Sequence, residues 1–330
     1  MLASISIHPV TALTCALALA VMAVNGWTDA PNAIATAVCT GALPFRRAAA
    51  LAALCNLLGL LWATAVNTTV AETLFDIAGF GADRAAASSA LCAGLCAVVL
   101  WSAAAWRFGI PTSESHGLAA AVTGAALALP GGAVRSGPWL RVLLGLGLSV
   151  TLGWLGGRLG RAALDLTRPG PGLCRRGQVG GAAAMAFLHG AQDGQKCLGI
   201  LLLGLSLPQG EPARASFSVP PELALLCAGV MAAGTTLGGD RIINRVGREM
   251  VCLSPRQGLA ADLGGGACLL VCTLLGLPVS TTHAKTAAIL GAGSRSDRRV
   301  AGEIALTWLC TFPGCGLLGF FLARLFRFGP

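Results

Sequence analysis

Two aspartates interrupt long apolar stretches of this sequence. Asp29 stands in the apolar run 12–43, and Asp193 stands in the apolar run 179–207. If these runs cross a membrane, each ionised carboxylate costs about 2.5–3.5 kcal/mol at the bilayer centre, so it needs a partner or a task. Helices that break beside such an acid expose backbone carbonyls, which are tolerated at that depth only where they line a cavity. Carboxylate and carbonyl oxygens suit Na⁺, and a carboxylate alone can carry a proton.

Two hydroxyl-rich stretches share a second pattern. Residues 109–116 read Gly-Ile-Pro-Thr-Ser-Glu-Ser-His, and residues 276–283 read Gly-Leu-Pro-Val-Ser-Thr-Thr-His. Pro111 and Pro278 suit the first turn of a helix, whose free N–H groups and positive dipole end would face the same point as the hydroxyls. This arrangement binds an anion with neutral donors. The candidate anion ligands are Thr112, Ser113, Ser115, Ser280, Thr281 and Thr282.

The composition indicates which elements must position these residues. The chain has 330 residues, of which 55% are hydrophobic and 11% charged, and this is too apolar for a soluble domain of its size. Apolar runs of about 20 residues, the length that crosses a bilayer as a helix, recur along the chain. We therefore expect an all-α membrane protein, a polytopic helical bundle of about 10 to 12 spans. The net charge of +9 comes from short basic clusters between the runs, so we expect no nucleic-acid partner.

Both patterns occur twice at a nearly constant spacing. The step along the chain from Asp29 to Asp193 is almost the same as the step from Gly109 to Gly276, where the second hydroxyl-rich stretch begins. Apolar runs lie on each side of a polar connector rich in arginine, glycine and proline. The sequence therefore predicts a first transmembrane repeat (residues 1–157), a cytoplasmic connector (158–177) and a second transmembrane repeat (178–330).

An odd number of crossings in each repeat would insert the second repeat upside down. The loop around Glu72 and Asp76 is net acidic, whereas the corresponding loop, 240–256, is rich in arginine. Because arginine favours the cytoplasmic side of the membrane, corresponding loops should lie on opposite sides. The sequence therefore predicts two inverted repeats with broken helices and short or re-entrant helices.

The only two lysines, Lys196 and Lys285, lie in or beside the second copies of these patterns. Each could neutralise an acid or attract an anion, and an ion pair or a snorkelling side chain without substrate contact is the alternative. His116 and His283 close the hydroxyl-rich stretches. No metal-binding spacing such as H-E-x-x-H occurs, so we expect these histidines to be hydrogen-bonding scaffold and no metal beyond Na⁺ at Asp29 and Asp193.

These stretches resemble a known family. Asn-Gly-Trp-Thr-Asp-Ala-Pro-Asn-Ala-Ile-Ala-Thr and His-Gly-Ala-Gln-Asp-Gly-Gln-Lys-Cys-Leu-Gly-Ile resemble the duplicated signature of the inorganic phosphate transporter (PiT) family, and the two hydroxyl-rich stretches are similar to its paired re-entrant elements. The resemblance implies a secondary transporter in which Asp29 and Asp193 bind the coupling cation and the hydroxyl clusters hold phosphate. Thr28 and Gln192 stand where the family usually has Asn, and Glu114 replaces a usual Ser or Thr.

We therefore predict a symporter, not an enzyme, that imports inorganic phosphate with Na⁺ or H⁺ and needs no cofactor. We expect it to be a multi-pass protein of the cell (inner or plasma) membrane, with a homodimer left open. Gln192 joins the candidate anion ligands, and the candidate cation-coupling residues are Asp29, Asn32, Glu114 and Asp193. Alternatives are a sulfate or other oxyanion permease, an anion channel and, remotely, an intramembrane aspartyl enzyme. Glu114 could also accept a hydrogen bond from protonated phosphate and so disfavour sulfate.

The inverted arrangement predicts where two loops react. In a background without the native cysteines, a cysteine placed next to Glu72 should be labelled by an impermeant thiol reagent added outside the cell. A cysteine placed next to Arg245 should be labelled only from the cytoplasmic side, because its loop is basic. Labelling of both from the same side would contradict the inversion.

Overall fold

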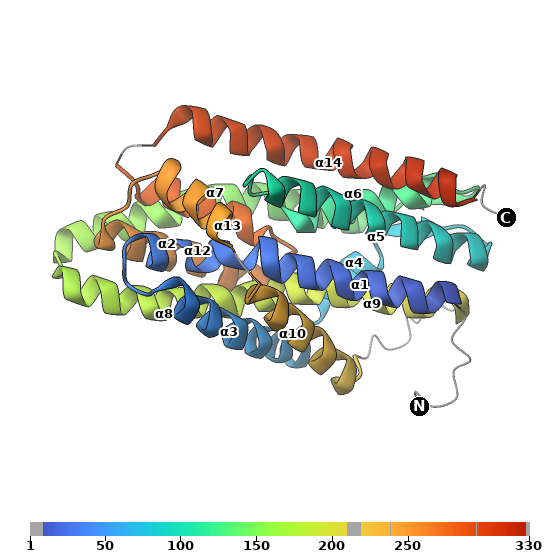
Figure 1. Cartoon of the computed structure of the whole chain (residues 1–330), viewed down its shortest axis with the longest axis horizontal. Helices are drawn as coiled ribbons and strands as arrows, with labels where there is room; N and C mark the ends of the chain where they lie inside the picture. The colour runs from blue at the N-terminus through green and yellow to red at the C-terminus, as the bar shows by residue number, and fades with distance from the viewer. Residues whose placement is uncertain (1–8, 210–218, 238, 295, 328–330) are drawn as a thin grey trace.

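The computed structural model describes residues 9–209, 219–237, 239–294 and 296–327 (Figure 1). Most of these residues form an elongated bundle of helices, and the strands β1 (Ala78–Phe80) and β2 (Gly132–Val134) pair antiparallel with Ala78 opposite Val134. The helices are α1 (Pro9–Thr28), α2 (Ala30–Cys39), α3 (Phe45–Val66), α4 (Thr69–Phe75), α5 (Arg84–Arg107), α6 (Glu114–Leu127), α7 (Ser136–Thr167), α8 (Pro171–His189), the π-helical turn η1 (Gly190–Gly194), α9 (Gln195–Ser206), the 3₁₀ turn η2 (Leu207–Gln209), α10 (Pro221–Thr235), α11 (Asp240–Asn244), the π-helical turn η3 (Arg245–Glu249), α12 (Pro255–Leu274), α13 (Thr281–Ala292) and α14 (Arg298–Arg327).

Long apolar helices account for most of the bundle. Six helical segments in the described ranges are long and apolar enough to cross a membrane, and the first of them, Pro9–Cys39, joins α1 to α2. The apolar runs that contain α6 and α13 hold helices of 14 and 12 residues. At about 1.5 Å per residue these two helices are too short to cross roughly 30 Å of hydrocarbon alone. Helix α7 extends to Thr167 and α8 begins at Pro171, so most of the predicted connector 158–177 is helical.

The two interruptions predicted from the aspartates take different forms. Asp29 is a single residue between α1 and α2, and its own N–H still bonds to the carbonyl of Asn25 at 2.9 Å. Asp193 lies in η1, where the helix widens for one turn and continues from α8 into α9 without a gap. The second interruption is therefore a π-helical turn and not a break, a form that often marks functional positions in helices.

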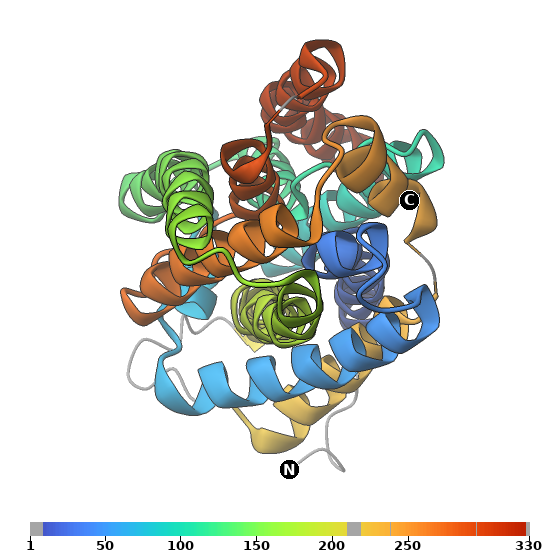
Figure 2. The same ribbon diagram turned by 90° about the vertical axis from the view of Figure 1, so that its left-hand side faces the viewer.

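Corresponding helices of the two halves have corresponding neighbours. Helix α1 packs on α5 and α10, as α8 packs on α12 and α3. The last helix of each half packs on the other half, because α7 lies against α12 and α13 while α14 lies against α5 and α6. Helices α1 and α2 run along the long axis in one direction and α8 and α9 in the other (Figure 1). Viewed along that axis, α14 lies at the periphery of the bundle (Figure 2).

A glycine within each signature stretch, Gly26 in the first and Gly190 in the second, permits a close helix crossing. A Cβ atom on Gly190 would lie 2.1 Å from the carbonyl oxygen of Asn56, and a Cβ atom on Gly59 would lie 1.8 Å from that of Phe187. The corresponding crossing of α1 with α10 is equally tight at Gly26. Small residues let membrane helices approach until their backbones touch, and that contact replaces the missing hydrophobic driving force in lipid.

Replacing Gly190 with alanine should destabilise the protein, because the new methyl group would force α8 and η1 away from α3. Overpacking of this kind costs about 1–3 kcal/mol. The check is the thermal unfolding midpoint of purified protein in detergent. Gly180→Ala, also in α8 but with open space around the new atom, is the matched control and should keep or raise the midpoint. Equal effects of the two changes would contradict the tight crossing.

Candidate functional site

The hydroxyl-rich stretches form two matching connections between helices. Gly109 and Gly276 adopt left-handed backbone angles, with φ of 69° and 65°. After α5, the N–H of Gly109 bonds to Trp106 and that of Ile110 to Ala105, and the same pair of bonds closes α12. These are Schellman caps, which end a helix at a glycine. The shared glycine and proline are thus explained as a helix stop and an extended connection to the next helix.

Each connection ends at a serine that caps the following short helix. Ser113 accepts from the N–H of His116 at 3.4 Å, and Ser280 accepts from the N–H of His283 at 3.2 Å. The prediction that proline occupies the first turn is wrong, since Pro111 precedes the capping serine by two residues. The proline rigidifies the approach to the helix, and the serine hydroxyl satisfies a free N–H group.

Asp193 lies where both short helices begin. Its Oδ1 accepts from the Ser115 hydroxyl at 3.0 Å and from Lys196 Nζ at 2.5 Å. Its Oδ2 accepts from the Thr281 hydroxyl at 2.7 Å and lies 3.3 Å from His189 Nε2. Groups from α6, α8, α9 and α13 therefore meet at one carboxylate, which is buried.

Lys196 connects the two hydroxyl clusters. Its ammonium group donates to Asp193, to the Ser115 hydroxyl at 2.8 Å and to the main-chain carbonyl of Val279. The Lys196 side chain is buried, so it does not snorkel. Of the roles open for Lys196, the structure therefore shows an ion pair with Asp193. The same ammonium also contacts the hydroxyl of Ser115, a candidate anion ligand.

Asp29 lies near this group, on the side of α1 and α2. Its carboxylate is 3.4 Å from the Thr28 hydroxyl and 3.4 Å from the backbone N–H of Glu114, the first residue of α6. Asn32 donates to the main-chain oxygen of Asp29 at 3.1 Å and to the Thr282 hydroxyl at 3.2 Å. The first half's aspartate is thus linked to the second half's short helix.

Glu114 contributes a third buried carboxyl group. Its side chain lies beside Asn25 and Thr28 and is close enough to Asp29 and Asp193 to interact with both charges. Neither of its carboxylate oxygens makes a well-formed hydrogen bond in the described part of the chain. We call Asp29, Glu114, Ser115, Asp193, Lys196, Thr281 and Thr282 the central cluster.

Two other predicted ligands lie at the edge of the central cluster. The Gln192 amide donates to the Thr273 hydroxyl at 3.0 Å and to the Leu277 carbonyl at 3.1 Å, and it accepts from the N–H of Val279 at 3.3 Å. Gln192 therefore braces the connection between α12 and α13 in this conformation. Thr112 is buried just before α6.

Sequence reasoning missed Asn56. Its amide oxygen accepts from His189 Nδ1 at 3.1 Å and its amide nitrogen donates to the Thr235 hydroxyl at 3.0 Å, so it links α3 and α10 to the histidine beside Asp193. An amide in the middle of the apolar run 48–70 was the available signal. The rings of His116 and His283 lie 4.8 Å apart, and His283 packs at 3.7 Å on Trp308 of α14.

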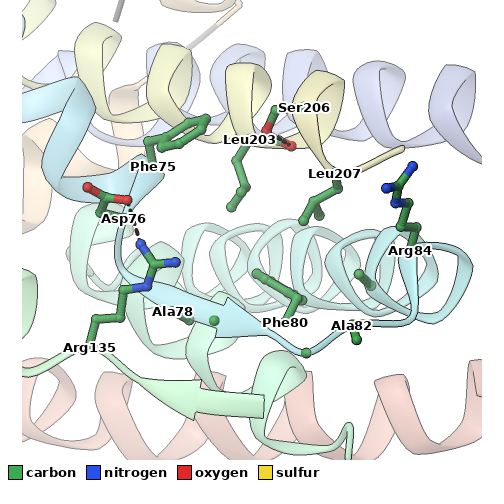
Figure 3. Close-up of a pocket in the computed structure, with 13 residues that line it drawn as sticks. Phe75, Asp76, Ala78, Phe80, Ala82, Arg84, Arg135, Leu203, Ser206 and Leu207 are labelled. Atoms are coloured by element: carbon green, nitrogen blue, oxygen red, sulfur yellow. Dashed lines mark hydrogen bonds and ion pairs between the residues drawn. The ribbon is translucent and has the colours of Figure 1, made fainter. Parts of the chain in front are cut away.

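A separate pocket of about 270 Å³ lies at the C-terminal end of α9 (Figure 3). It is lined by Leu203 and Ser206, and its wall includes Arg84 and the ion pair between Arg135 and Asp76 at 2.6 Å. Leu203 follows Asp193 by ten residues, about 15 Å along a helix. The central cluster does not line this pocket.

The sequence and the fold of this chain are similar to those of known proteins. The sequence model described as the phosphate transporter family matches residues 25–168 and again residues 161–319. A probable low-affinity inorganic phosphate transporter of Mycobacterium bovis is 36% identical over 94% of this chain and 76% of its own length. Proteins with the same description in Bacillus subtilis and Rhizobium meliloti are 33% and 34% identical, over 94% and 89% of this chain and 95% and 90% of their own lengths.

A solved structure described as the sodium-dependent phosphate transporter has the same fold. Its TM-score is 0.85 at 18% sequence identity, and the match covers 97% of this chain and 99% of that chain. The prediction of a polytopic helical membrane bundle is therefore confirmed. Because the family's sequence model matches both halves, and because the relatives from Mycobacterium bovis and Bacillus subtilis match over most of their lengths, this chain belongs to the phosphate transporter family.

Proposed function

We propose that this protein is a secondary active transporter that imports inorganic phosphate together with Na⁺ or H⁺, with the central cluster as its binding site. Its relatives are transporters, so it is a multi-pass protein of the cell membrane and not an enzyme, as the sequence predicted. The observation that carries the finer proposal is the meeting of three buried carboxyl groups with one ammonium group and hydroxyls from both short helices.

The donors of the central cluster suit an oxyanion. Ser115, Thr281 and Thr282 offer hydroxyl groups within the first turns of α6 and α13, where the helix dipole favours negative charge. Lys196 adds a compact positive charge that already touches the Ser115 hydroxyl. Ser115, Thr281 and Lys196 donate to Asp193, so a phosphate would bind by taking over the bonds of Lys196 and these two hydroxyls.

The carboxyl groups suit a coupling cation. If Asp29, Glu114 and Asp193 are all ionised, Lys196 balances only one of the three charges, and uncompensated charge at this depth is expensive. Lys196 contacts Asp193, whereas Asp29 and Glu114 contact no basic side chain in the described ranges. We therefore place the coupling cation between Asp29 and Glu114, with the Asn32 amide as a further oxygen ligand; its Oδ1 is buried and free of hydrogen bonds in the described structure.

The comparisons favour phosphate over sulfate, because the relatives covering most of this chain are described as inorganic phosphate transporters. The solved protein of the same fold is described as sodium-dependent, which supports Na⁺ as one of the two candidate coupling ions. We further propose that the halves are inverted repeats that exchange access to the central cluster. The opposite course of α1–α2 and α8–α9 supports this.

The two aspartates should be indispensable for coupled transport. Asp29→Asn and Asp193→Asn each remove a charge that the cation or Lys196 needs, so gradient-driven phosphate uptake should fall to background in proteoliposomes while the protein still folds. Asp165→Asn removes an exposed aspartate that pairs with Arg161 and Arg256, and uptake should be unchanged. Concentrative uptake by both site variants would refute the assignment.

Glu114 should affect coupling and not anion choice, because its carboxylate lies beside Asn25, Thr28 and Asp29. Glu114→Gln should change the Na⁺ or pH dependence of uptake, while sulfate should compete with labelled phosphate as weakly as in the unaltered protein. Glu249→Gln, a change on an exposed side chain bonded to Arg245, is the control. If Glu114→Gln instead strengthened competition by sulfate, Glu114 would belong to the anion site.

A further inference from the structure

A second buried ion pair lies outside the central cluster. Lys285 of α13 contacts the carboxylate of Asp262 in α12, and both side chains are fully buried. The Lys285 ammonium also donates to the Thr36 hydroxyl at 3.1 Å and to the main-chain carbonyl of Ala33 at 3.5 Å. Thr36 in turn donates to Asp262 Oδ1 at 2.6 Å. Three elements, α2, α12 and α13, are thus joined by one polar group of residues.

The fold itself does not require these polar residues. The step that relates Asp29 to Asp193 pairs Thr36 with Ile200. The step that relates Gly109 to Gly276 pairs Leu95 with Asp262 and Leu118 with Lys285. Ile200, Leu95 and Leu118 are buried together in one hydrophobic core. Since an apolar replacement of a buried ion pair is often neutral or stabilising, the pair of Asp262 and Lys285 calls for a role other than packing.

Helix α8 has a glycine, Gly181, where it faces the side chain of Asp262. A Cβ atom on Gly181 of α8 would lie 2.6 Å from Asp262 Cβ and 2.9 Å from its Oδ2. The corresponding residue of the first half is Leu17, which packs against the apolar core. Asp262 Oδ2 is itself buried without a hydrogen-bond partner in the described structure. A free carboxylate oxygen therefore remains beside Lys285.

The oxygen atoms around Lys285 repeat those around Lys196. Each ammonium is held by one carboxylate, one hydroxyl and one main-chain carbonyl. These are hard oxygen ligands of the kind that bind metal cations in proteins. The ammonium group of a lysine can take the place of such a cation, because it is a compact point charge on a flexible stem.

The position of this group relates it to the central cluster. Asn32, Thr36 and Thr40 are spaced four residues apart, so they lie along one face of α2 and its end. Asn32 contacts Thr282 of the central cluster, Thr36 contacts Asp262, and Thr40 bonds to Gln178 of α8 at 2.6 Å. A line of polar side chains therefore leads from the central cluster to the C-terminal end of α2.

We propose that the Asp262 carboxylate, the Thr36 hydroxyl and the Ala33 carbonyl form a second alkali-cation site on this polar line, and that the Lys285 ammonium is its built-in occupant. The site is distinct from the one between Asp29 and Glu114. Lys285 keeps it filled, so no free ion is held there while the ammonium stays in place. This second site does not depend on the protein carrying phosphate.

Removing the ammonium should open the site to Na⁺. The full-length protein is purified, and its thermal unfolding midpoint is compared in sodium chloride and choline chloride of equal ionic strength. Lys285→Ala should show a sodium-specific rise of the midpoint that exceeds the rise in the unaltered protein. The excess should vanish when Asp262→Asn is added. Asp262→Leu with Lys285→Leu, which copies the first half, should fold in either salt and show no excess.

The other possible results of this comparison each support or overturn the second cation site. Folding of Lys285→Ala in sodium but not in choline would support the site. A folded Lys285→Ala protein without excess sodium stabilisation would overturn it, as would an excess that survives Asp262→Asn. Failure of Lys285→Ala to fold in both salts, with or without folding of the double leucine variant, would also overturn it, because Na⁺ would then not replace the ammonium.

Discussion

The ion pair between Asp193 and Lys196 is the contact on which the centre of this protein depends. It joins the π-helical turn of one half to a hydroxyl from α6 and to the backbone before α13. Breaking a buried pair by removing one partner typically costs about 3–5 kcal/mol, so this contact fixes how the two short helices meet. A substrate that weakens it would also loosen the hold between the halves.

The close packing of the helices follows from the need to shield these buried polar groups from lipid. Polar groups can sit at this depth only where neighbouring backbones exclude lipid, and the glycines Gly26, Gly59 and Gly190 allow that approach. Helix α7 of the first half packs on α13 of the second half, and α14 of the second half packs on α6 of the first half. His283 and Trp308 form part of that contact, which gives the histidine of the shared pattern a packing role.

Much of this arrangement could be predicted from the sequence, because aspartates, prolines and glycines in apolar runs are rare and repeat at fixed spacing. The short helices and the family were predicted from these residues and the helical bundle from the apolar runs, and all three are confirmed. The prediction that a proline starts each short helix was wrong. The Schellman glycine ends one helix, the capping serine begins the next, and the proline lies in the extended connection between them. The contact of Asn56 with His189, and the pairing of Asp262 and Thr36 with Lys285, could not be predicted, because they depend on which helices cross and at what depth.

The buried carboxyl groups are proposed to couple phosphate movement to a cation. The deciding measurement is labelled phosphate uptake into proteoliposomes, with Na⁺ and pH gradients imposed separately. Coupling predicts accumulation above the outside concentration under one of the two gradients and simple equilibration when neither is present. Equilibration alone under every gradient would contradict the claim and indicate a channel.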